Sequence, residues 1–199
     1  MNGGQTKTGI IKSIGLCVQR PTWLTKSRTP MRMDSYLEKC KALSLTAREA
    51  IALHCFEKYC EKRQLKCSLI DEAIEYLWRW PLIDGPDEFE PWESNKAALI
   101  NYGFGESIPT ELGKVLKDRE VDEEEFKHIL EALIDILWAN FWGASDDEFS
   151  LNSLKTVIEL TSLEKLPKIE TYQVSKFCDM HGWGNKISRN DYERWRSTW

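Results

Sequence analysis

The chain has 199 residues, of which 42% are hydrophobic and 30% charged, a balance typical of one globular domain. It contains no run of 18 apolar residues, so the sequence predicts no membrane span. Residues 1–32 hold six basic residues and no acid, which leaves a net charge of −11 on residues 33–199. An acidic body of this kind disfavours nucleic acid and anionic lipid and favours basic protein partners.

The six cysteines show no paired spacing, and a chain of this length does not need a disulfide framework. Reduced, mostly buried thiols are the expected state, which indicates a cytoplasmic protein. The first part of the chain, residues 1–33, differs in composition from the rest, being basic and containing many Gly, Pro, Ser and Thr residues. We expect it to be a poorly ordered leader, either a transit peptide or, more simply, an over-extended gene start. Residues 34–199 then form the helical domain.

Helical periodicity begins near Asp34 and predicts a short helix over residues 35–43. A second helix is expected to start at Thr46, with Glu49 completing a capping box, and to run to Arg63. A third begins near Ser68 and ends at Pro81.

Residues 81–93 contain three prolines, and we therefore expect a loop. Short helices are predicted over residues 94–102 and 110–117. The second half of the chain predicts four more helices, at Asp122–Gly143, Leu151–Leu163, Pro167–Met180 and Tyr192–Arg196. The acidic turn Ser145–Glu148 precedes the second of these, and Ser188 with Asp191 starts the last. The predicted fold class is all-α, a single-domain antiparallel helical bundle or array of about seven helices.

One helical face offers a candidate metal site, formed by Glu124, His128, Glu131 and Asp135. Glu125 and His128 also match half of a di-iron bundle motif, which needs a second Glu-x-x-His on another helix. No glutamate stands three residues before either of the other histidines. We therefore interpret the stripe as a solvated polar face and predict no metal or cofactor. A metal-dependent enzyme that uses this cluster stays the alternative.

Cys178 and His181 have the spacing of zinc ligands, but no second close pair accompanies them, which favours free thiols. The sequence also contains no Gly-x-Ser-x-Gly elbow, no P-loop and no dinucleotide-binding fingerprint. We find no residue with the pattern of a catalytic group and therefore look for a binding site among the exposed residues.

Acidic residues beside aromatic ones are typical of protein-binding patches, because charge speeds the encounter and an aromatic ring anchors the complex. Two segments have this character, residues 81–93 and 145–148, and a Gly-Trp-Gly turn at 182–184 adds a large ring. In the competing interpretation, segments 81–93 and 145–148 are solvated loops and helix caps, and the rings of Phe89 and Trp92 are buried. The Trp183 ring would then pack against the helical bundle. The candidate partner-binding residues are Asp84, Asp87, Glu88, Phe89, Glu90, Trp92, Asp146, Asp147, Glu148 and Trp183.

The layout of residues 34–192 carries a family resemblance. A helix follows Thr46, Ala73–Trp80 leads into an acidic Trp-bearing segment, a long apolar helix ends near an acidic turn, and His181–Asn185 reads His-Gly-Trp-Gly-Asn. This order resembles the small acidic all-helical immunity proteins of bacterial toxin–immunity systems, including contact-dependent inhibition.

The resemblance implies a non-catalytic protein that neutralises a cognate toxin, such as a basic nuclease domain, by direct binding. Besides the metal-dependent enzyme, a helical adaptor or regulator with another protein partner stays open.

Overall fold

A computed structural model describes residues 30–198 of the chain. These residues form nine α-helices and three short 3-10 helices, with no strand among them. In chain order the elements are α1 (Pro30–Cys40), α2 (Leu45–Arg63), α3 (Ser68–Trp78), η2 (Trp80–Leu82), α4 (Pro86–Ser94), α5 (Ala98–Gly103), α6 (Thr110–Asp118), α7 (Glu123–Trp138), α8 (Asp147–Thr161), η3 (Ile169–Tyr172), η4 (Met180–Gly182) and α9 (Arg189–Arg196). The all-α prediction is confirmed, whereas the described residues form nine helices and not about seven; the regular antiparallel bundle stays a prediction.

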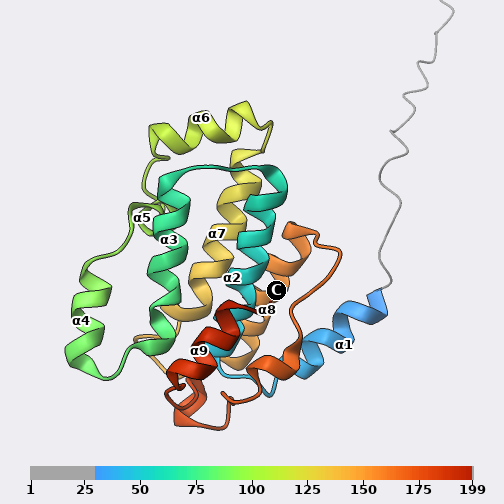
Figure 1. The fold of residues 1–199 in the computed structure, drawn as a ribbon, viewed down its shortest axis with the longest axis vertical. Helices are drawn as coiled ribbons and strands as arrows, with labels where there is room; N and C mark the ends of the chain where they lie inside the picture. Colours follow the sequence, from blue (N-terminus) through green and yellow to red (C-terminus); the bar gives the residue numbers. More distant parts are fainter. Residues whose placement is uncertain (1–29, 199) are drawn as a thin grey trace, which may run out of the picture.

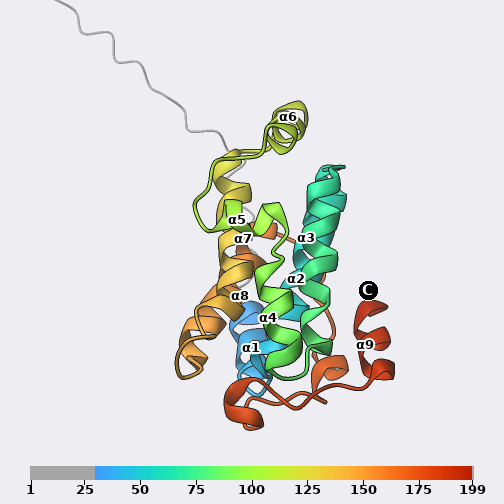
Figure 2. The same cartoon turned by 90° about the vertical axis from the view of Figure 1, so that its left-hand side faces the viewer.

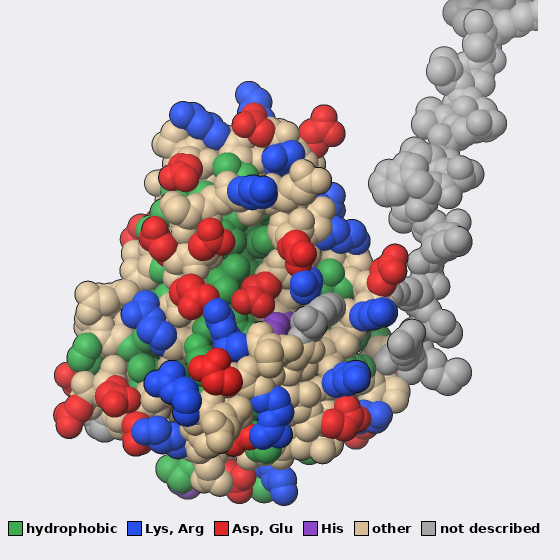
Figure 3. All heavy atoms as spheres, viewed as in Figure 1, with side chains coloured by type: hydrophobic (Ala, Val, Ile, Leu, Met, Phe, Trp, Pro, Cys, Tyr) green, Lys and Arg blue, Asp and Glu red, His purple; other side chains and the backbone are tan. Residues whose placement is uncertain are grey.

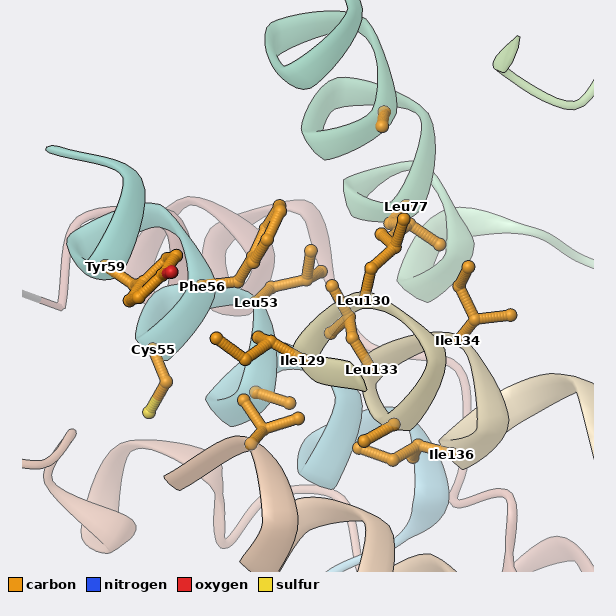
Figure 4. Packing of buried hydrophobic residues seen from close by; sticks show 14 of the residues in the cluster. Leu53, Cys55, Phe56, Tyr59, Leu77, Ile129, Leu130, Leu133, Ile134 and Ile136 are labelled. Carbon is orange, nitrogen blue, oxygen red and sulfur yellow. The ribbon is translucent and has the colours of Figure 1, made fainter. Parts of the chain in front are cut away.

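The core is built where α2, α7 and α8 pack together, with α3 against α2 (Figure 1). α7 is apolar on several sides, and Ile129, Leu133 and Ile136 are completely buried. In Figure 4, Ile129 points toward Leu53 and α2, whereas Ile136 lies on another side of α7. An amphipathic helix buries one stripe, but a helix covered on several sides needs apolar residues all round, which this sequence supplies. The predicted central role of this helix is confirmed.

The start of α2 differs from the prediction. Ser44 is the N-cap, and its Oγ accepts a hydrogen bond from the Ala47 amide at 3.1 Å. Thr46 lies inside the helix and donates its hydroxyl to the Trp183 carbonyl at 2.8 Å. Glu49 is fully buried and forms no hydrogen bond through its carboxyl. The capping box is therefore wrong, because tertiary contacts with the C-terminal segment determine where this helix begins.

Three other helix starts follow local capping rules. Asp122 accepts from the Glu124 amide at 2.8 Å and caps α7, and Asp146 accepts from the Phe149 amide at 2.8 Å and caps α8. Ser188 accepts from the Asp191 amide at 3.1 Å and caps α9, as predicted. α7 ends at Trp138, five residues before the predicted end at Gly143. Asn140 causes part of this break, since its side chain binds the Ile136 carbonyl and the Asp146 amide.

Two predicted segments are wrong. Residues 81–93 form the end of η2 and most of α4 instead of a loop, because Pro86 occupies a first-turn position where no amide donor is needed. The helix expected over residues 167–180 is replaced by η3 and irregular chain. There the backbone pairs with the entry to α2, through Ser44 N to Ser175 O at 3.1 Å and Phe177 N to Ala42 O at 3.0 Å.

The basic leader expected over residues 1–33 lies outside the described residues, apart from its last four residues, which begin α1. The predicted boundary at residue 34 therefore falls inside a helix. None of the helices that residues 30–198 form combines the length and the apolar character needed to cross a bilayer. The five described cysteines are all free thiols.

Candidate protein-binding site

Aromatic rings from four parts of the chain meet at one end of the molecule. α4 is held there by Trp92, whose ring stacks on Tyr76 of α3 at 4.8 Å and 4°. The same two residues exchange hydrogen bonds, since Tyr76 Oη donates to the Trp92 carbonyl and Trp92 Nε1 donates to the Tyr76 carbonyl, both at 3.1 Å. Trp92 also stacks on Trp138 of α7 at 5.2 Å. These contacts place α4 over the edge formed by α3 and α7 (Figure 2).

Phe141, just after α7, is the centre of the outer part of this cluster. Its ring lies 5.1 Å from Trp80, 5.1 Å from Phe89 and 5.4 Å from Trp183, the last pair being stacked at 11°. The segments predicted to bind a partner are therefore brought together in space, although they lie about 90 residues apart in sequence. Phe89 and Trp183 are half-buried, and part of each ring is covered by its neighbours.

Trp142 continues the cluster out into solvent. Its side chain is 79% exposed, and its ring lies 6.3 Å from that of Phe89. Sequence reasoning missed this residue, because it placed Trp142 inside the apolar half of a helix that extended to Gly143. The signal that could have found it is Asn140, whose side chain competes for helix hydrogen bonds and ends α7 before the tryptophan is reached.

The predicted acids divide into two groups. Several are used within the fold: Asp84 pairs with Lys186 at 2.6 Å, Glu88 accepts from the Asp84 amide at 2.7 Å, and Asp147 pairs with Arg48 at 2.5 Å. Asp146 caps α8. By contrast, three exposed acids form neither an ion pair nor a side-chain hydrogen bond with residues 30–198, namely Asp87, Glu90 and Glu148. These three carry the charge that a partner could meet directly.

Two of the aromatic residues predicted to bind a partner, Trp92 and Trp183, do not project into solvent. Trp92 is only 6% exposed and belongs to the core, because its ring stacks on those of Tyr76 and Trp138. Trp183 is held in a tight turn by Gly182 and Gly184, with φ of +97° and +81°. A Cβ at Gly184 would overlap the Ser175 hydroxyl. Only glycine therefore permits this turn to lie against the entry of α2.

The charged residues that sequence reasoning weighed as a metal site are spread along α7. Glu124 and His128 are exposed, while Glu131 pairs with Lys127 at 3.7 Å. Burial, with the nearby Glu131 charge, raises the pKa of Asp135 above its ordinary value. Within residues 30–198, no three His, Cys, Asp or Glu side chains are grouped as metal ligands. Glu125 instead accepts a hydrogen bond from Tyr59 at 2.9 Å and cross-links α7 to α2.

Comparison of the chain with protein-family models, curated proteins and solved structures gives no match. The Trp142 face is defined here as Phe89, Phe141 and Trp142 together with Asp87, Glu90 and Glu148. It combines an exposed aromatic anchor with acids that are not used within the described fold.

Proposed function

We propose that this protein is a non-catalytic protein-binding protein and that the Trp142 face is its binding surface. The observation that supports this most directly is the exposure of Trp142, at 79%, beside the Phe89 ring of a packed aromatic cluster. A tryptophan ring has large apolar area, and leaving it in water forgoes roughly 25 cal/mol per Å² of burial. Tryptophan is also among the residues that contribute most to protein–protein affinity.

The chemistry of the partner follows from the charges. Asp87, Glu90 and Glu148 have no compensating cation in the described part of the chain, and residues 33–199 carry a net charge of −11. Complementary fields speed association and discourage wrong partners, so the partner should present a basic surface with an apolar recess for the indole. A basic toxin domain has these properties, and the proposed role is that of a cytoplasmic immunity protein which neutralises it.

The proposal is tested by co-expression with the product of the adjacent gene, where the toxin of such a system should be encoded. The wild-type chain should restore growth of cells that express this product and should co-purify with it. Trp142→Ala should lose both properties, while Val174→Ala, which shortens another exposed apolar side chain, should keep them. Equal protection by Trp142→Ala and wild type would exclude the Trp142 face as the binding surface. Measurement of stoichiometric iron or manganese in purified protein would instead favour the metal-dependent enzyme.

A further inference from the structure

A second surface feature, separate from the Trp142 face, is a groove between α2 and α3. It has a volume of about 400 Å³, and Figure 3 shows apolar side chains along it with acidic side chains on both sides. Its lining residues are Glu57, Cys60, Glu61, Leu65, Ile70, Asp71, Ile74 and Glu75. Helical spacing explains the pattern, because residues three and four apart share one face, so each helix contributes both apolar and acidic side chains.

The rim keeps an excess of negative charge after its internal pairs are counted. Glu57 and Glu75 both pair with Arg196 of α9, and Glu61 pairs with Lys58 at 2.6 Å. Asp71 is exposed and has no ion pair with any residue between 30 and 198. Four acids therefore face two cations. The apolar floor beneath them includes Ile74, which is only half-buried.

One segment of this chain has the complementary chemistry. Residues 10–18 contain five aliphatic side chains, and Lys7, Lys12 and Arg20 lie within or beside them. Residues 1–32 contain no acid, so nothing in the segment would oppose the groove's rim. Aliphatic side chains fit the apolar floor, while lysine and arginine fit the acidic rim and can extend their stems along apolar surface.

The intervening chain can span a large part of the molecule. Nine residues, 21–29, separate this segment from the start of α1. Fully extended, nine residues span about 30 Å, which is close to the length of a 19-residue helix such as α2. From these matches we propose that residues 7–20 occupy the α2–α3 groove of their own chain.

Methyl NMR of the full chain tests this directly. Nuclear Overhauser effects should connect the methyl groups of Ile10, Ile11 or Ile14 with those of Ile70 or Ile74. The double variant Lys7→Glu/Lys12→Glu should remove these effects and shift the Ile74 resonance, because it reverses the charge that faces the rim. Lys114→Glu/Lys117→Glu changes the same number of charges on exposed positions of α6 and should leave the effects intact. Raising the salt concentration should weaken them, because ions screen exposed charges.

Three results would overturn the proposal. The first is an Ile74 methyl resonance that is identical in wild type and in Lys7→Glu/Lys12→Glu. The second is a set of effects that appears only between differently labelled molecules in a mixed sample, which would make the occupant a second copy. The third is contact of residues 10–14 with the Trp142 face instead of the groove. The first two results do not bear on whether Trp142 binds a partner, so the two proposals can fail separately.

Discussion

Arg48 of α2 and Asp147 of α8 form an ion pair whose two ends lie in different surroundings. The Arg48 side chain is completely buried, whereas that of Asp147 is 47% exposed, and Nη2 and Oδ1 are 2.5 Å apart. Arg48 also donates to the carbonyls of Cys40 at 3.2 Å and Lys41 at 2.9 Å and to Ser150 Oγ at 2.6 Å. Its guanidinium stacks over the Phe177 ring at 4.8 Å. One buried cation thus connects α1, α2, α8 and the C-terminal segment.

Removal of that cation should destabilise the protein strongly. Arg48→Met leaves buried carbonyl and hydroxyl acceptors without donors, and we expect the free energy of unfolding to fall by about 3 kcal/mol. Urea denaturation measures the change. Glu148→Gln, which neutralises an exposed acid next to Asp147, is the control and should change stability by less than about 0.5 kcal/mol. A small effect of Arg48→Met would contradict the structural role assigned to this network.

Glu49 makes stability depend on pH. Burial raises the pKa of its carboxyl well above the ordinary value of 4.5, so the folded state holds a proton that the unfolded state releases. Its contribution is fully present below pH 4.5 and is lost as pH rises towards the folded-state pKa. Each pH unit in this range costs up to about 1.4 kcal/mol.

Glu49→Gln should remove that dependence. The variant should be more stable than wild type at pH 7, and the difference should shrink towards zero near pH 4.5. Thermal unfolding of both proteins across this pH range provides the measurement. A difference that is constant with pH would mean that Glu49 does not titrate on folding.

The Gly-Trp-Gly turn should tolerate no Cβ at Gly184. Its φ of +81° is unfavourable for alanine, and the added methyl group would also press on Ser175 and Ser44. We expect Gly184→Ala to lower stability by about 3 kcal/mol, from strain and overlap together. Gly105→Ala is a matched control, because Gly105 has φ of +101° but nothing within 4 Å of the added Cβ. It should cost only about 1 kcal/mol; equal losses at both positions would show that packing at Gly184 is unimportant.

Substitution of two tryptophans near the same end of the molecule should change stability by very different amounts. Trp92→Ala removes a buried ring that stacks on Tyr76 and Trp138, and it should lower the free energy of unfolding by about 3 to 5 kcal/mol. Trp142→Ala removes a ring that is 79% exposed and should change it by less than about 0.5 kcal/mol. Chemical denaturation separates the two. A large loss of stability in Trp142→Ala would indicate that this ring stabilises the fold and is not available to a partner.

The sequence was sufficient for the helices whose starts depend on neighbouring residues. Asp122 and Ser188 each cap the helix that follows, as predicted, and the apolar pattern of α7 correctly predicted a central helix. The predicted start of α8 was wrong, because Asp146 caps it and the helix begins at Asp147 and not at Leu151. The sequence was insufficient where contacts with distant residues determine the start of a helix. Ser44, and not Thr46, caps α2, because the backbone and side chain of Ser44 pair with Ser175, 131 residues away.

The same limit applies to the candidate site. Sequence reasoning found the two acidic segments that contribute to the Trp142 face. It did not show which acids pair within the fold, as Asp147 does with Arg48 and Asp84 with Lys186. It also predicted Trp92 as a binding residue, because three prolines indicated a loop where a helix turns this ring inward. Trp142 was missed because the end of α7 depends on Asn140, whose side chain bonds two backbone groups.

The most direct test of the proposed binding surface is a calorimetric titration of the adjacent gene's product with three forms of this protein: wild type, Trp142→Ala and Val174→Ala. The account predicts one-to-one binding by wild type and Val174→Ala, and an affinity at least about 30-fold lower for Trp142→Ala, which corresponds to roughly 2 kcal/mol. Binding of Trp142→Ala with wild-type affinity would contradict it.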